Sequence, residues 1–262
     1  MSGGRLWVPL RSSDYRRLWL GQTISVIGDK VDQIALSVLV YQRTGSELQM
    51  GITLAISMLP AAMFGMLAGA YVDRWDRRTT MLVSDIARAA LVFSVPFAAE
   101  VGLWLVYVLA FLIAMVSLFF EPAKLSLIPD LVGADELLAA NSLDNATVSA
   151  AELAGLAFAG GIVAGLGYRA AFFFDAATYL VSAAFIWSIA YRGQSRLPLE
   201  GARWRDAVRD ALEGTRYVVG HPVLKDLLVV YSVVSAGIAA TVTFTTLLAL
   251  DRFGGGDPAR GA

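Results

Sequence analysis

The chain has 262 residues, of which 57% are hydrophobic and 16% are charged, and its mean hydropathy is +0.62. A soluble domain is about 45–50% apolar and about 25% charged, so this composition is typical of a membrane protein. The net charge of −1 offers no basic excess for nucleic acid. Cysteine is absent and His221 is the single histidine, which excludes disulfides, thiol nucleophiles and imidazole metal clusters. We therefore expect neither an enzyme nor a bound cofactor or metal.

Seven stretches are long enough to cross a bilayer, because about 20 helical residues span a hydrocarbon core of about 30 Å. Four carry embedded charges and three carry none. In chain order they are 18–41, 51–72, 79–99, 101–120, 146–168, 170–191 and 227–250. Backbone groups in lipid must bond to one another, so the predicted fold class is all-α, a polytopic membrane helix bundle.

The distribution of Lys and Arg predicts the orientation of these spans. With the N-terminus in the cytoplasm, fifteen Lys and Arg fall inside and four fall outside. This bias predicts a multi-pass protein of the cell (plasma) membrane, surrounded by lipid, with a cytoplasmic N-terminus. The predicted organisation is a six-helix bundle (1–192), a cytoplasmic linker with an amphipathic helix (193–225), and a seventh helix with a polar tail (226–262). An odd number of spans indicates an incomplete chain.

The turn between the second and third predicted spans carries the most specific local motif. Its glycine permits close helix approach, and its carboxylates can pair with arginines or with a helix N-terminus. The motif residues are Gly69, Asp73, Arg74, Asp76, Arg77 and Arg78. We expect this loop to act as a gate or latch. The alternative is a positively charged loop that only fixes topology.

Three carboxylates inside the predicted spans are candidates for proton coupling. Asp29 and Asp32 share one face of the first span near the bilayer midplane, and Glu152 lies within the fifth. Lys30 points away from the aspartate face and needs a partner on another helix. Ionisable groups at such depths are unfavourable and usually face a cavity or a partner. The alternative is a neutralised cluster that holds the bundle together.

Two further features have structural interpretations. Asp85 and Arg88 are three residues apart in the third span, which predicts an ion pair. Asp175, near the outer end of the sixth span, carries little information by itself. A run of small residues in the fifth span predicts close helix packing; its glycines include Gly155, Gly160 and Gly161.

Together these motifs resemble the major facilitator superfamily, in particular its drug:proton antiporter branch of macrolide-efflux and enterobactin-exporter-like proteins. Segments beginning at Leu18, Phe119 and Leu137 are also similar to that branch. The resemblance implies the six-helix N-terminal half of a twelve-helix fold plus a seventh helix, with substrate between the halves. It also implies that Asp73 latches a helix of the second half. The branch's Gly-Pro antiporter motif is not reproduced, because Leu156 follows Gly155.

The expected function is a secondary active transporter, proton-coupled and exporting small amphipathic molecules such as drugs, macrolides or siderophores. Its expected partners are a small-molecule substrate, the proton, and a missing C-terminal half on the same or another chain. The alternative is a non-transporting truncated membrane module, or a half-transporter that needs a partner chain. An in-frame continuation of the gene with five further apolar spans would favour the transporter, and a stop codon the alternative.

Overall fold

The computed structural model describes residues 6–72 and 75–191, and beyond them residues 216–217, 220–227, 229–230, 233–234 and 237. The chain divides into two units, Met1–Ala202 and Arg203–Ala262. The second unit is described as short helical pieces, in one of which the Lys225 N–H donates to the His221 carbonyl oxygen at 3.0 Å. The predicted linker 193–225 and the seventh helix with its tail, 226–262, lie largely outside the described residues.

The first unit is built from long helices. A short 3₁₀ turn, η1 (Val8–Arg11), precedes α1 (Ser13–Thr44), α2 (Glu47–Val72), α3 (Arg77–Val101), α4 (Leu103–Leu131) and α5 (Leu137–Trp187). Within the described residues no strand occurs, which confirms the predicted all-α class. By length and composition, stretches of α2, α3, α4 and α5 are each able to cross a membrane.

α5 contains two of the predicted spans. Its 51 residues would extend about 76 Å as one straight helix, more than twice a bilayer core. The helix is interrupted at Gly167, whose φ of 81° lies in the region that favours glycine. The pieces before and after Gly167 correspond to the predicted spans 146–168 and 170–191. The first six predicted spans therefore all fall on helices.

Local sequence explains where these helices begin and end. α1 ends at Gly45, which adopts a left-handed φ of 61° and donates its N–H to the Tyr41 carbonyl oxygen at 2.7 Å. α3 begins after Asp76, whose carboxylate accepts the Thr79 N–H at 2.7 Å. Asp76, predicted as part of the gate motif, therefore acts as an N-cap in the structure.

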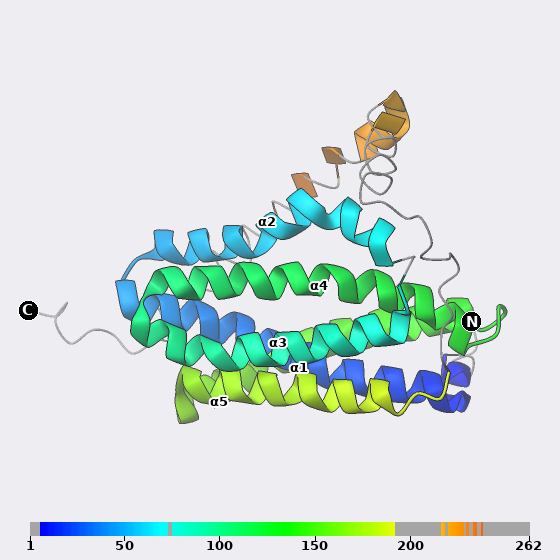
Figure 1. The fold of residues 1–262 in the computed structure, drawn as a ribbon, viewed down its shortest axis with the longest axis horizontal. Coiled ribbons are helices and arrows are strands. Elements are labelled where there is room, and N and C mark those ends of the chain that lie inside the picture. The colour runs from blue at the N-terminus through cyan, green and yellow to red at the C-terminus, as the bar shows by residue number, and fades with distance from the viewer. Residues whose placement is uncertain are drawn as a thin grey trace, which may run out of the picture. The chain divides into compact units, whose positions relative to one another are not determined.

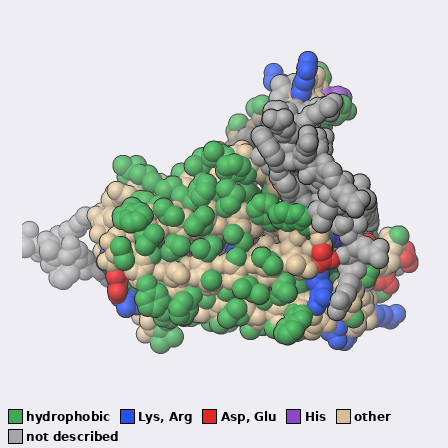
Figure 2. All heavy atoms as spheres, in the orientation of Figure 1, with side chains coloured by type: hydrophobic (Ala, Val, Ile, Leu, Met, Phe, Trp, Pro, Cys, Tyr) green, Lys and Arg blue, Asp and Glu red, His purple; other side chains and the backbone are tan. Residues whose placement is uncertain are grey.

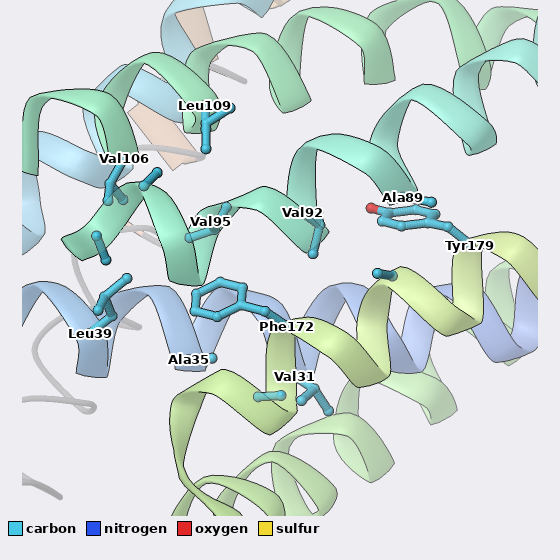
Figure 3. Packing of buried hydrophobic residues seen from close by; sticks show 14 of the residues in the cluster. Val31, Ala35, Leu39, Ala89, Val92, Val95, Val106, Leu109, Phe172 and Tyr179 are labelled. Atoms are coloured by element: carbon cyan, nitrogen blue, oxygen red, sulfur yellow. The ribbon is translucent and has the colours of Figure 1, made fainter. Parts of the chain in front are cut away.

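The helices of the first unit run side by side, as Figure 1 shows. α1 packs along α5, α3 packs on α4 and α5, and α2 packs on α4. Figure 3 shows Phe172 of α5 among aliphatic side chains of α1 and α3. This core is formed by small and branched side chains, among them Val31, Ala35, Leu39, Ala89, Val92, Val95, Val106 and Leu109.

Apolar side chains also cover the outside of the bundle. Met58, Leu153 and Trp187 have 59%, 76% and 72% of their surface exposed. Figure 2 shows hydrophobic side chains over most of the visible face of the helices, with most visible charged side chains near the ends. Large continuous apolar surfaces are rare on soluble monomers, so this surface fits a lipid environment.

Glycines set the distance between α1 and α5. A Cβ placed on Gly155 would lie 2.6 Å from Lys30 Cβ, and one on Gly28 would lie 2.1 Å from Thr178 Oγ1. The close approach predicted from small residues therefore occurs at Gly155, and Gly28 on α1 adds a second point that the sequence reading missed. Gly160 and Gly161 were predicted to do the same, and that prediction is wrong within the described residues. Both are exposed and have nothing within 4 Å of an added Cβ, whereas Ala159 next to them is buried in the core with α1 residues, so these two positions lie on the outer side of α5.

This difference generates a prediction. Gly155→Ala should lower the free energy of unfolding by about 1–3 kcal/mol, because the new methyl group meets Lys30 Cβ, which moves only with the α1 backbone. The matched control is Gly161→Ala on the same helix, which has open space and a gain in helix propensity. Thermal unfolding of the purified chain in detergent measures both. Equal melting temperatures for the two variants would contradict the proposed close contact.

Candidate functional site

A cavity of about 350 Å³ lies among α1, α3, α4 and α5. This volume is within the range of about 300–1,000 Å³ typical of small-molecule sites. Its wall is unusually polar for a bundle of apolar helices. The lining residues are Gln22, Ser25, Val26, Asp29 and Lys30 of α1, Arg88 of α3, Phe120, Glu121 and Lys124 of α4, and Asp144, Asn145, Val148 and Glu152 of α5.

Lys30 and Glu152 form an ion pair across the seam between α1 and α5. Lys30 Nζ lies 2.9 Å from Glu152 Oε1, and their side chains are 30% and 49% exposed. The partner that Lys30 required on another helix is therefore Glu152. The sequence reading treated Glu152 as a buried carboxylate with no cation on its own helix; in the structure its side chain is 49% exposed and its cation comes from α1. Packing at Gly155, one turn further along α5, brings the two helices close enough for this pair.

Arg88 is one of the buried cations of the bundle. It forms an ion pair with Asp85, which is fully buried, as the spacing of the two residues on α3 suggested. The guanidinium carbon also lies 4.3 Å from the ring centroids of both Phe120 and Tyr179. Aromatic faces attract cations, and more strongly where water is excluded. Arg88 therefore links α3 to α4 and α5.

Asp29 joins this group through a tyrosine. The Tyr179 hydroxyl donates a hydrogen bond to the Asp29 carboxylate, which also lines the cavity. Asp32, one turn further along α1, does not line the cavity, and its Oδ1 is buried without a hydrogen-bond partner among the described residues. The two predicted aspartates thus have different environments. The sequence placed both on one face of the helix but did not reveal the tyrosine.

Other polar residues of the site were missed by the sequence reading. Lys124 Nζ lies 3.0 Å from Glu121 Oε1 and 3.1 Å from Asp144 Oδ2, so one buried ammonium holds two carboxylates. Gln22 Nε2 donates to Ser182 Oγ at 3.0 Å between α1 and α5. A lysine three residues after a glutamate, close to an apolar span, was the available signal for the first of these contacts.

The arginines after α2 tie one end of the bundle together, here called the arginine-rich end. Arg77, which is buried, donates to the Ser126 carbonyl oxygen at 2.8 Å and to the Asp130 carboxylate. Arg78 donates to the carbonyl oxygens of Ile186, at 3.0 Å, and Trp187. Cations stabilise the unpaired carbonyls at a helix C-terminus, so Arg78 secures the end of α5.

The remaining motif residues are only partly described. Gly69 lies within α2, and Asp73 and Arg74 lie outside the described residues. The described part of the motif thus contacts α4 and α5 of its own bundle through Arg77 and Arg78. Its predicted role as a gate stays a prediction.

Tyr15 also secures the arginine-rich end, outside the predicted span 18–41. Its hydroxyl donates to the Ala140 carbonyl oxygen at 2.9 Å. Burial, and secondarily the negative charge of Asp144, raise the pKa of the Tyr15 phenol. The phenol therefore keeps its proton and its hydrogen bond across the physiological pH range.

The burial of Arg88 generates a prediction. Asp85→Asn should lower the free energy of unfolding by about 3–5 kcal/mol, because it leaves a buried guanidinium without its closest countercharge. The matched control is Glu100→Gln, which removes one carboxylate from the Arg169 pair, whose side chains are about half exposed (52% and 54%). Exposed ion pairs contribute little to stability, so this change should hardly alter the free energy of unfolding. Melting temperatures of the two variants in detergent provide the comparison, and a similar loss in both would contradict the role given to Asp85.

Comparison with known proteins supports a transporter. The chain is 28% identical over 200 residues to the MFS-type transporter YfiS of Bacillus subtilis, a match that covers 75% of this chain and 48% of YfiS. It is 31% identical over 217 residues to the multidrug efflux pump Tap of Mycolicibacterium fortuitum, covering 78% of this chain and 51% of Tap. It is also 31% identical over 123 residues to macrolide efflux protein A of Streptococcus pyogenes, covering 46% of this chain and 30% of that protein.

The chain spans about half the length of the first and second of these relatives. No solved structure matches it significantly. A family model described as the Major Facilitator Superfamily matches residues 18–261, nearly the whole sequence. The helical bundle, its apolar exterior and this match agree. The chain therefore belongs to the Major Facilitator Superfamily of multi-pass membrane transporters.

Proposed function

We propose that this chain forms one half of a proton-coupled efflux transporter for small amphipathic molecules. The observation that carries the proposal is the cavity of about 350 Å³ whose wall combines charged side chains with apolar surface. An amphipathic molecule needs both kinds of contact. The names of two relatives, a multidrug efflux pump and a macrolide efflux protein, support export as the direction.

Proton coupling is assigned to the carboxylates on or near that wall, namely Asp29, Asp32 and Glu152. Glu152 forms an ion pair with Lys30, in which Lys30 Nζ lies 2.9 Å from Glu152 Oε1. When Glu152 takes up a proton, its charge disappears and the attraction to Lys30 is lost. The pair joins α1 to α5, so protonation weakens one contact between the helices that line the cavity.

The family resemblance adds a second half that completes the cavity, on the same chain or on another. Substrate then binds between the halves, and access alternates as they rock against each other. The motif around Asp73 and Arg77 acts as a gate at the arginine-rich end. The alternative function is a non-transporting truncated membrane module, or a half-transporter that needs a partner chain.

Drug accumulation tests the transport proposal. Cells that lack their main efflux pumps should accumulate less of a labelled macrolide, or of ethidium, when they express the complete gene that encodes this chain. A protonophore should abolish the difference, because it removes the proton gradient. Accumulation equal to that of vector controls in both conditions contradicts transport by this chain and favours the alternative. Repeating the assay with a co-expressed second half, taken from a relative such as Tap, tests the half-transporter form of that alternative.

The same assay tests the role of Glu152. Glu152→Gln keeps the size of the side chain and removes its titrating proton, so uncoupler-sensitive efflux should be lost. Glu100→Gln, on an exposed pair with Arg169, is the matched control and should retain efflux. Efflux by Glu152→Gln at the wild-type rate removes Glu152 from the proton pathway and leaves Asp29 and Asp32 as the candidates.

Orientation is tested by cysteine labelling, because the natural chain has no cysteine. Ala134 lies in the turn between α4 and α5, and Leu48 lies at the start of α2; both side chains are exposed. If the N-terminus is cytoplasmic, an impermeant maleimide should label Leu48→Cys in intact cells and Ala134→Cys only after the cells are opened. The reverse pattern would contradict the proposed orientation.

A further inference from the structure

Asp175 was not singled out by the sequence, yet it lies against α1 at the point of closest helix contact. Its side chain is fully buried on α5. A Cβ added to Gly28 would lie 2.3 Å from Asp175 Oδ1, so the carboxyl group rests directly on the α1 backbone. Asp32 is four residues after Gly28 and therefore lies on the same face of α1. The two carboxyl groups thus occupy one buried seam.

Each of these carboxyl groups has an unsatisfied oxygen. Asp32 Oδ1 and Asp175 Oδ2 are buried and have no hydrogen-bond partner among the described residues. The other oxygen of Asp175 lies 3.1 Å from the Thr178 hydroxyl. A buried carboxylate oxygen without a donor is strongly unfavourable, because it has lost water and gained nothing in return. A proton is the smallest ligand that removes this penalty.

The surrounding charges do not neutralise the pair. From α3, Arg88 lies over the ring of Tyr179, which is one turn from Asp175 on α5, and Arg88 is already paired with Asp85. From α1 and α5, Asp29 and Tyr179 face the pair, and these are joined by their own hydrogen bond. Lys30, the nearest other cation on α1, is committed to Glu152. Neither Asp32 nor Asp175 therefore has an ion-pair partner in the part of the chain that the structure describes.

We propose that Asp32 and Asp175 share one proton in a buried carboxyl–carboxylate pair, and that Asp175 is thereby a proton-coupling residue of this transporter. The protonated oxygen donates to the unprotonated one, which satisfies both orphaned atoms with a single short hydrogen bond. The proton is taken up from water and returned to water. The coupling role rests on the transport function proposed above, whereas the shared proton does not.

The location of Asp32 and Asp175 between α1 and α5 explains how their shared proton would change the shape of the cavity. Loss of the proton leaves two carboxylates facing each other where α1 and α5 touch without spare room at Gly28. Their repulsion pushes the helices apart. The same two helices carry Lys30 and Glu152 on the cavity wall. Deprotonation of the Asp32–Asp175 pair therefore changes the packing that holds the cavity in shape.

Infrared spectroscopy of the purified full chain in detergent tests the shared proton. At neutral pH the wild type should show a protonated carboxyl C=O band that is lost in both Asp32→Asn and Asp175→Asn. The double variant should lose no more band intensity than either single variant, because only one proton is shared. Glu100→Gln is the control and should keep the band. Absence of the band in the wild type, or its retention in both single variants, overturns the proposal.

Two further arms separate the alternatives. Replacing potassium by sodium should leave the wild-type band unchanged, and its loss would mean that the pair binds a metal cation in place of the proton.

In the accumulation assay, Asp175→Asn should lose uncoupler-sensitive efflux, and full retention would overturn its coupling role. If the wild type shows the shared-proton band but no uncoupler-sensitive efflux, the proposed function fails and the proton assignment stands. If an Asn variant does not fold, the wild-type band and its response to pH decide the proton assignment.

Discussion

Arg88 is the charge around which the interior of the bundle is arranged. A guanidinium in an apolar helix bundle is tolerated only if its charge and its donors are compensated. The structure compensates the charge with the Asp85 carboxylate from its own helix and with two ring faces, Phe120 from α4 and Tyr179 from α5. The Nε of Arg88 has no hydrogen-bond partner among the described residues. Tyr179 in turn donates to Asp29 of α1. One cation thereby holds four helices in register and sets one wall of the cavity.

The close contact between α1 and α5 depends on residues without side chains at the points where the helices meet. Gly28 and Gly155 let the helices approach so closely that an added methyl group would overlap the opposite helix. In lipid there is little hydrophobic gain from bringing two apolar helices together, so close packing and polar contacts must supply the stability. The Lys30–Glu152 pair and the Gln22–Ser182 hydrogen bond lie along this seam. The carboxyl groups assigned to proton coupling thus lie at the contact between α1 and α5, where a change of charge alters the attraction between the two helices.

The arginine-rich end has a different chemistry from the middle of the bundle. There the arginines act on backbone carbonyls and on exposed or partly buried carboxylates. Arg78 donates to Ile186 and Trp187, and Arg17 donates to the Ser188 carbonyl oxygen at 2.7 Å. These contacts close the last turn of α5. A gate at this end would therefore move against helices whose ends are already joined by hydrogen bonds.

The sequence by itself determined the class of protein, the position of six helices and the presence of ionisable groups within them. Those results follow from length, hydropathy and turn chemistry, which are local properties. Hydropathy also explains why the rest was not predictable: outward and inward faces are both apolar in a membrane bundle, so the pattern does not show how each helix is rotated about its axis. Rotation decided that Lys30 meets Glu152, that Tyr179 meets Asp29, and that Gly155 packs while Gly160 and Gly161 do not. It also placed Asp175, uninformative as a single residue, beside the α1 face that carries Asp32. Contacts between helices far apart in the chain depend on the tertiary structure alone, because side-chain pairing requires a distance and a direction that no local pattern encodes.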